Sequence, residues 1–411
     1  MKQGLAARRA ALAMLRGVLQ EGKMLSDLTL PDLAPAERAR ARRLAEETLR
    51  RVEPADTLLK PFLRRAPAAE VRNILRLALV EMALGAAAHG VVDAAVTLTR
   101  DGRKTCHMAG LVNAVLRRAS ADMLATMPVQ KLPRWLRQPL VHAYGRDAVA
   151  MMEKVQATAP PIDLTPSGRG EMPEGLTLPS GSLRIEPGQQ ISALPGYEAG
   201  NWWVQDAAAA IPARLLSPQP GERVLDLCAA PGGKTMQLAA AGARVTALDI
   251  SESRMERLRE NLARTGLASD LVVADALRWQ PEQAFDAILL DAPCSASGTL
   301  RRHPDLPFVK DGAGIESLLA LQAELTGRAL NWLKPGGRLV YAVCSLLPRE
   351  GEDQLAAILA SRADLRVEQV DLAGIDPDWW TDRGGLRLRP DYWAEKGGMD
   401  GFFCARMRRV P

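Results

Sequence analysis

The stretch Val224-Leu-Asp-Leu-Cys-Ala-Ala-Pro-Gly-Gly-Lys-Thr235 decides how the second half of the chain folds. Its first four residues predict a buried β-strand, and the small residues after them predict a tight turn before a helix that opens at Thr235. Backbone without bulky side chains lets a ligand approach main-chain N–H groups and the N-terminus of a helix. The stretch therefore predicts a ligand-binding turn, although an ordinary glycine-rich turn between strand and helix fits it equally well.

Two phosphate-binding motifs do not fit this turn. A P-loop requires a glycine five residues before Gly233, and Cys228 occupies that position. A dinucleotide-binding turn requires Gly-x-Gly-x-x-Gly, which is absent here, so a dehydrogenase is excluded as well. What remains is a turn that holds a nucleoside without a pyrophosphate, as in enzymes that use S-adenosylmethionine (SAM).

The rest of the chain predicts a multidomain protein. Strands are expected at 223–227, 244–249, 270–274, 286–291 and 337–343, helices at 235–241, 252–265, 314–333 and 350–361, and a closing strand at 402–407. This alternation predicts an α/β, Rossmann-like domain with a mostly parallel sheet over 201–411. Helical periodicity alone predicts an all-α bundle over 1–125. A small α+β connector is expected over 126–200, where the chain becomes rich in Pro, Gly and Ser from residue 159.

Composition indicates a globular protein. The chain has 411 residues, of which 47% are hydrophobic and 25% charged, and it has no apolar run long enough to span a bilayer. Arginines interrupt the N-terminal segment where a signal peptide would have its apolar core. The five cysteines form no Cys-x-x-Cys pair, which argues against disulfides and against a metal site. We expect a cytoplasmic monomer without a metal and without a membrane partner.

Positive charge is concentrated at the start of the chain. Residues 1–130 contain 21 Lys and Arg but 13 Asp and Glu, whereas the remainder contains 32 and 35. A basic domain of this kind predicts a polyanionic partner such as a nucleic acid. A solvated helical surface rich in arginine explains the composition equally well.

Acidic residues follow the predicted strands next to the turn. Asp249 lies 23 residues after Asp226, close to the offset at which an acid reaches the ribose of a bound nucleoside. Asp249 could instead cap the helix that follows it. Asp275 ends the third predicted strand and Asp291 ends the fourth. Acids at successive strand ends, together with the turn, favour a nucleoside cofactor.

Two cysteines, Cys294 and Cys344, follow the fourth and fifth predicted strands. A single cysteine there would most often be an inert, buried side chain. A pair suits the methylation of a pyrimidine at carbon 5, because a thiolate that adds to carbon 6 makes carbon 5 nucleophilic. A base must later remove the carbon-5 proton, so two cysteines fit two steps. Asp291 could hydrogen-bond the ring edge of a cytosine.

Several motifs resemble those of a known family. Asp226–Thr235, Asp291-Ala-Pro-Cys294 and Tyr341-Ala-Val-Cys344-Ser345 are similar to motifs of RNA cytosine-5 methyltransferases. Val112-Asn-Ala-Val-Leu-Arg-Arg118 resembles the end of a NusB-like RNA-binding domain. With Arg301-Arg-His-Pro-Asp305 and Asp400-Gly-Phe-Phe403, the resemblance is to the RsmB/Sun (Fmu) family and covers nearly the whole chain.

The resemblance implies roles for individual residues. Cys344 would be the nucleophile and Cys294 the residue for product release, with Asp291 and Lys234 completing the catalytic site. The residues implied in binding SAM are Cys228, Ala229, Ala230, Pro231, Gly232, Gly233, Lys234, Asp249, Asp275 and Asp291. The implied partner is ribosomal RNA, naked or in an early small-subunit particle. Two alternatives stay open: the same reaction on tRNA or another rRNA, and a NusB-like RNA-binding or assembly factor without activity.

Overall fold

The computed structural model describes residues 4–29 and 32–410, so the outermost residues of the first and last predicted domains lie outside the described part. The chain forms two compact units. The helical unit comprises residues 1–159 and 300–311, and the sheet unit comprises residues 160–299 and 312–411. This grouping does not test the predicted boundaries at residues 125 and 200, which stay predictions.

The helical unit is built from short amphipathic helices, as the periodicity predicted. Its helices are α1 (Leu5–Leu19), α2 (Pro35–Leu49), α3 (Val52–Leu59), α4 (Ala69–Ala83), α5 (Ala88–Asp101), α6 (Ala109–Leu116), α7 (Ala121–Ala125), α8 (Arg134–Tyr144), α9 (Arg146–Gln156) and α13 (Leu306–Val309). Helix α4 is buried on most of its faces, and its side chains belong to two apolar clusters. A helix buried on most of its faces lies at the centre of such a bundle, and its buried polar side chains, Asn73, Arg76 and Glu81, are hydrogen-bonded.

Some arginines of the helical unit form ion pairs with buried carboxylates of the same unit. The buried Glu81 carboxylate accepts hydrogen bonds from Arg8 Nε at 2.6 Å and from Arg40 at 2.8 Å. Glu47 pairs in the same way with Arg50 and Arg51. Because a buried charge requires a partner, these arginines stabilise carboxylates that would otherwise be costly to bury.

The sheet unit begins with a small antiparallel sheet. Its strands are β1 (Ile162–Pro166), β2 (Leu176–Thr177), β3 (Leu183–Ile185) and β4 (Trp202–Val204), in the order β2-β3-β1-β4. The buried Asp163 on β1 accepts two hydrogen bonds from Arg184 on β3, at 2.6 and 2.8 Å, and one from the Ala207 N–H. The β-structure that was expected within 160–200 is therefore present.

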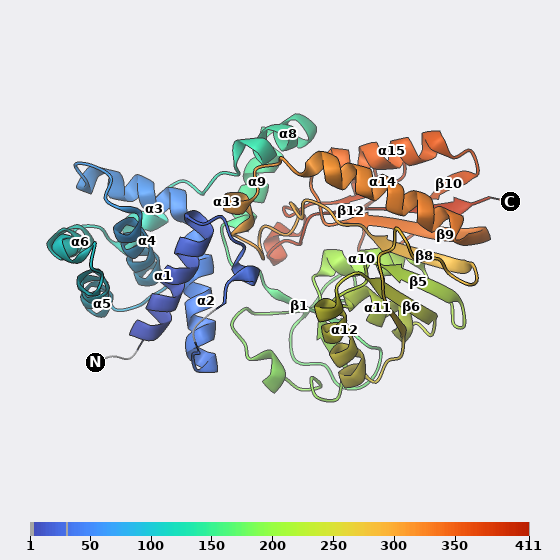
Figure 1. Cartoon of the computed structure of the whole chain (residues 1–411), viewed down its shortest axis with the longest axis horizontal. Coiled ribbons are helices and arrows are strands. Elements are labelled where there is room, and N and C mark those ends of the chain that lie inside the picture. The colour runs from blue at the N-terminus through green and yellow to red at the C-terminus, as the bar shows by residue number, and fades with distance from the viewer. Residues whose placement is uncertain (1–3, 30–31, 411) are drawn as a thin grey trace. The chain divides into compact units, whose positions relative to one another are not determined.

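Within the described part of the chain, the large sheet of this unit has eight strands in the order β10-β12-β9-β8-β5-β6-β7, with β11 paired to β12 (Figure 1). The strands are β5 (Arg223–Leu227), β6 (Arg244–Asp249), β7 (Asp270–Val273), β8 (Phe285–Asp291), β9 (Leu333–Val343), β10 (Leu365–Glu368), β11 (Leu386–Leu388) and β12 (Phe402–Arg409). Strands β5 to β9 pair in parallel, and β12 is antiparallel to β9, β10 and β11. The predicted mostly parallel sheet is confirmed.

Helices cover both faces of the large sheet (Figure 1). They are α10 (Ala207–Leu216), α11 (Gly233–Ala240) and α12 (Glu252–Thr265) on one face, and α14 (Ile315–Asn331) and α15 (Glu352–Ser361) on the other. Along β8, Ala287 and Leu289 pack toward the first face, whereas Ile288 and Leu290 pack toward the second. Two-residue alternation thus gives a three-layer α/β/α domain.

The structure corrects some predicted element boundaries. Helix α11 begins at Gly233, two residues before the expected start at Thr235, and the preceding Gly232 has a left-handed conformation. Strand β7 ends at Val273, so Asp275 lies two residues beyond the strand rather than at its last position. Helix α10 and strands β10 and β11 were not predicted.

Candidate active site

The turn after β5 is shaped by two residues with positive φ. Cys228 has a φ of 63° and Gly232 a φ of 102°. A Cβ atom on Gly232 would lie 2.0 Å from Leu258 Cδ1 of α12, so only glycine fits this close approach. The sequence folds this way locally because small residues let the backbone reverse while α12 packs directly against it.

Asp249, at the end of β6, holds this turn in place. One carboxylate oxygen accepts a hydrogen bond from the Ala230 N–H at 3.1 Å, and the other accepts one from the Ser251 N–H at 2.9 Å. The cap of helix α12 itself is the Ser251 side chain. Asp275 accepts a hydrogen bond from the Leu277 N–H at 2.9 Å. Both acids therefore order the loops that follow their strands.

Asp226, on β5 beneath the turn, is completely buried. One carboxyl oxygen accepts a hydrogen bond from Thr235 Oγ1 at 2.6 Å, and the other has no hydrogen-bond partner among the residues that the structure describes. Burial raises the pKa of Asp226 to about 7, against the lowering effects of Thr235 and the nearby Lys234. An orphaned polar atom below the turn is consistent with a polar ligand or water that completes the site.

Asp291, at the end of β8, is paired with Lys234 of helix α11. The Lys234 Nζ atom lies 2.7 Å from the Asp291 carboxylate and 5.4 Å from the centre of the Phe402 ring. Burial alone would lower the pKa of Lys234, but the Asp291 carboxylate outweighs it and the pKa is raised. The Lys234 ammonium thus fixes Asp291 at the carboxyl edge of the sheet.

The two predicted thiols lie side by side. The Sγ atoms of Cys294 and Cys344 are 3.4 Å apart, within hydrogen-bond range for sulfur. The hydrogen bond with Cys344, together with burial, raises the pKa of Cys294 well above its ordinary range. Cys294 therefore stays protonated and can donate its S–H to a thiolate at Cys344.

Backbone contacts connect the two thiol-bearing segments. The Gly298 N–H donates to the Cys344 carbonyl at 3.0 Å, and the Gly401 N–H donates to the Gly298 carbonyl at 2.8 Å. A Cβ atom on Gly298 would lie 1.9 Å from the Gly401 carbonyl oxygen. The start of β12 is therefore held against both cysteine segments. The glycine of the Asp400-Gly-Phe-Phe403 motif permits this close backbone contact.

Sequence reasoning missed several residues at this edge. Ser295 and Ser345, each directly after a cysteine, both donate hydrogen bonds to the buried Glu350 carboxylate. The available signal was the repeated Cys-Ser pair. Ile250 is 69% exposed although it is apolar, and it follows Asp249 directly. The signal there was an isoleucine immediately after a strand-end acid.

The other cysteines lie elsewhere. Cys404 is fully buried in β12, where burial raises its pKa to about 12, and Cys106 is exposed in the helical unit. Burial also raises the pKa of Cys228, so this thiol is a poor nucleophile despite its place in the turn. Over residues 4–29 and 32–410, no group of three or more His, Cys, Asp or Glu side chains could hold a metal ion.

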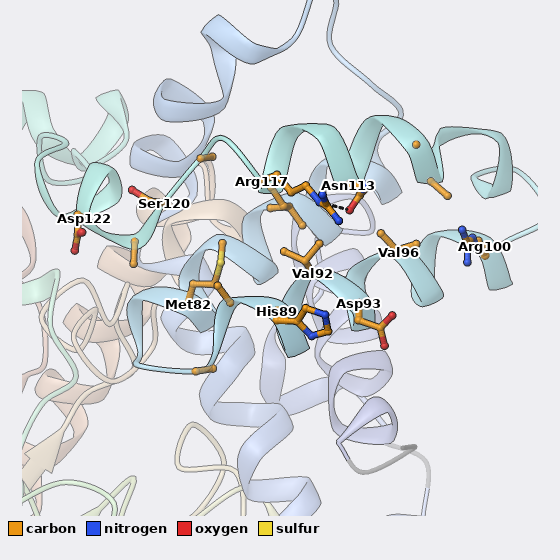
Figure 2. Close-up of a pocket in the computed structure, with 17 residues that line it drawn as sticks. Met82, His89, Val92, Asp93, Val96, Arg100, Asn113, Arg117, Ser120 and Asp122 are labelled. Carbon is orange, nitrogen blue, oxygen red and sulfur yellow. Dashed lines mark hydrogen bonds between the residues drawn. The ribbon is translucent and has the colours of Figure 1, made fainter.

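The helical unit has a hollow of its own, of about 880 Å³, between α5 and α6 (Figure 2). Its polar lining includes Asp93 and Arg100 from α5 and Arg117, which donates to Asn113 at 3.2 Å. Asp122 contributes a second acid. Because positive and negative side chains balance, this hollow is not the strongly cationic surface that a phosphate backbone selects.

A doubly covered sheet, with a glycine turn after β5 and acids following β6, β7 and β8, defines the class: this is an α/β methyltransferase domain preceded by a helical domain. Residues 213–408 match the family described as 16S rRNA methyltransferase RsmB/F, and residues 5–121 match the NusB family. The chain belongs to the RsmB/F family and is an RNA methyltransferase.

Individual relatives agree with this assignment. The ribosomal RNA small subunit methyltransferase B of Xanthomonas campestris pv. campestris is 36% identical over 397 residues, which cover 89% of this chain and 90% of the relative. The solved structure of PH0851 covers 99% of both chains with a TM-score of 0.76 at 22% identity, which concerns the fold alone. A methyltransferase homologue from Pyrococcus horikoshii is 26% identical, with a TM-score of 0.56, and covers 66% of this chain and 94% of its own.

Among the described residues, no helix is long and apolar enough to cross a membrane. The expected cytoplasmic location and monomeric state stay predictions.

Proposed function

We propose that this chain transfers the methyl group of SAM to carbon 5 of a cytosine in small-subunit ribosomal RNA, through a covalent adduct between Cys344 and the base. The observation that carries the proposal is the 3.4 Å separation of the Cys294 and Cys344 sulfur atoms at the ends of neighbouring parallel strands. A carbon-5 methylation needs a nucleophile and later a base, and a thiol pair supplies both.

Cys344 is the better nucleophile of the pair. Its peptide follows β9 directly, and a thiolate on its sulfur would accept a hydrogen bond from Cys294. Ionisation of Cys294 is disfavoured, because its pKa is raised by the hydrogen bond with Cys344 and by burial. Addition of the Cys344 thiolate to carbon 6 makes carbon 5 electron-rich, and SAM supplies the electrophilic methyl group when it is bound.

The same pair explains how Cys294 becomes the base for product release. A negative charge on Cys344 is one cause of the raised pKa of Cys294. Once Cys344 is bonded to carbon 6 it carries no charge, so that cause disappears and Cys294 ionises more readily. Its thiolate then takes the carbon-5 proton, and the bond between Cys344 and carbon 6 breaks.

Asp291 and Lys234 hold the target base in this proposal. The Asp291 carboxylate accepts from Lys234 through one oxygen, and its side chain is 29% exposed. A carboxylate fixed in this way can accept a hydrogen bond from the amino group of cytosine and orient the ring over Cys344.

The turn from Cys228 to Gly233 and the loops after β6 and β7 are the proposed cofactor side of the site. Asp249 and Asp275 offer carboxylates for ribose hydroxyls or the amino acid group, and the orphaned oxygen of Asp226 fits a polar ligand above it. The exposed side chain of Ile250 offers an apolar surface for the adenine ring. The helical unit, which matches the NusB family, is the proposed site of RNA binding.

The product of the reaction tests this proposal. Unmodified small-subunit rRNA is incubated with SAM and enzyme, digested to nucleosides and analysed by mass spectrometry. Wild type and the exposed-thiol control Cys106→Ala should give 5-methylcytidine, whereas Cys344→Ala should lower its rate of formation by roughly a thousandfold or more. Methylation of another atom or nucleoside, full activity of Cys344→Ala, or methylation of tRNA in a parallel reaction but not of rRNA would contradict it.

A further inference from the structure

We propose that Glu350 is a positioning residue that sets the separation of the two thiols, an inference that rests on the proposed function for its catalytic consequence. Glu350 lies in the short helical turn 348–350 and is completely buried. Neither sulfur atom contacts its carboxylate among the hydrogen bonds of the described residues. It acts instead on the residue that follows each cysteine.

Both cysteine segments are bonded to this one carboxylate. The Ser295 N–H donates to one oxygen at 2.8 Å, and the Ser295 hydroxyl donates to the other at 2.5 Å. The Ser345 hydroxyl donates to that second oxygen, also at 2.5 Å. Residues 50 positions apart in the chain are therefore connected through a single side chain, immediately beside each thiol.

Further contacts keep the carboxylate itself in place. Gln322 of α14 donates from Nε2 to Glu350 at 3.1 Å and to the Pro293 carbonyl at 2.9 Å. The hydroxyl of Tyr341, in β9, donates to the Glu350 carbonyl at 2.7 Å. Ser297 completes the network, with its hydroxyl 3.0 Å from that of Ser345. A buried carboxylate with this many donors is rigid, and losing one bond leaves a buried polar group unpaired.

This arrangement has a specific consequence for catalysis. Transfer of a proton or a charge between the two thiols depends on their separation, and a shift of about 1 Å can cost about a hundredfold in rate. Glu350→Gln keeps the size of the side chain but replaces one acceptor with an NH₂ group, so it cannot receive all the present donors. The two segments should then separate or loosen.

Phenylarsine oxide tests the separation without any substrate. This reagent condenses with two neighbouring thiols to form a cyclic dithioarsenite and one molecule of water, which intact-mass measurement detects. Wild type should be bridged rapidly, Cys344→Ser should not be bridged, and Glu350→Gln should be bridged roughly tenfold more slowly. The matched control is Glu368→Gln, which loses a carboxylate bonded to Arg406 and Arg408 of β12 and should match wild type.

Methyl transfer by the same variants completes the test. Glu350→Gln should lose about a hundredfold in kcat with little change in SAM affinity, whereas Glu368→Gln should keep the wild-type kcat. If Glu350→Gln does not fold, Ser345→Ala should show the slower bridging and the lower kcat in its place. Ser345→Thr, which retains the hydroxyl, should then restore wild-type bridging and kcat. The proposal would be overturned if Glu350→Gln showed the bridging rate and kcat of wild type. If Glu350→Gln does not fold, the same result in Ser345→Ala would overturn it. If Glu350→Gln is bridged more slowly than wild type as expected, but no sample forms 5-methylcytidine, the proposed function is refuted and the positioning role of Glu350 stands.

Discussion

At the scale of single residues, the buried Asp226 carboxyl makes the stability of the folded protein depend on pH. Its pKa of about 7 means that the folded protein keeps this proton over a range in which the unfolded chain, with the usual value of 3.8, releases it. The folded state therefore binds more protons between these two values. Stability falls as the pH rises from about 4 to about 7, because the unfolded chain releases this proton over that range whereas the folded protein keeps it.

Asp226→Asn should remove this dependence. The amide keeps an acceptor for Thr235 and carries no charge at any pH, so the variant should gain stability relative to wild type as the pH rises from 4 to 7. The gain should be roughly 2–4 kcal/mol at the upper end. Urea unfolding at several pH values measures it, with Asp270→Asn, an exposed acid of β7, as the control. Parallel stability curves for wild type and Asp226→Asn would contradict the assignment.

The residues of the proposed catalytic site differ in how far the sequence alone could reveal them. Cys294 and Cys344 were recognisable because two thiols follow parallel strands, whose carboxyl ends meet at one edge of a sheet. Glu350 was not recognisable, since its role comes from hydrogen bonds to two segments that are distant in the chain. Asp249 was ambiguous in the sequence, and its carboxylate bonds to Ala230 of the turn as well as to Ser251.

At the scale of elements, the packing of α12 against the turn limits what Gly232 can be replaced by. Gly232→Ala puts a Cβ atom 2.0 Å from Leu258 Cδ1 at a φ of 102°, so it adds a steric clash to backbone strain. We expect a loss of about 3 kcal/mol in unfolding free energy, together with weaker SAM binding. Thermal unfolding and calorimetric titration with SAM measure the two effects.

Gly266→Ala is the matched control for this change. Gly266 also has a positive φ, of 61°, but no atom lies within 4 Å of its added Cβ. It should therefore show the backbone cost alone, about 1 kcal/mol, and normal SAM affinity. Equal losses for both variants would show that the close approach of α12 is unimportant.

The elements of the large sheet were predictable to the extent that they are periodic. Strands β5, β6 and β8 are short apolar runs that end in or next to an acid, and they lie where expected to within one residue. Strand β9 begins at Leu333 rather than at 337, because Leu333 pairs with Phe285 before a register irregularity. Helix α10 was missed, since a run of alanines interrupted by Pro212 gives no clear amphipathic pattern.

At the scale of the whole molecule, one segment departs from the order of the sequence. Residues 300–311 follow the Cys294 segment but belong to the helical unit. There the Asp305 carboxylate accepts a hydrogen bond from the Leu25 N–H at 2.7 Å, between residues 280 positions apart. No local pattern predicts such a contact, which explains why the Arg301–Asp305 motif could be recognised in the sequence but not interpreted.

The matches to the NusB and RsmB/F families account for the helical and the α/β parts of the chain. The central claim of the proposed function is the covalent adduct between Cys344 and cytosine. The most direct test incubates Cys294→Ala with SAM and unmodified small-subunit rRNA and looks for a protein–RNA adduct on a denaturing gel. In the proposed mechanism release needs Cys294 and attack needs Cys344. A slowly migrating adduct should therefore accumulate with Cys294→Ala and be absent from the double variant Cys294→Ala/Cys344→Ala. An adduct that persists in the double variant, or one that forms with Cys344→Ala and requires Cys294, would contradict the account.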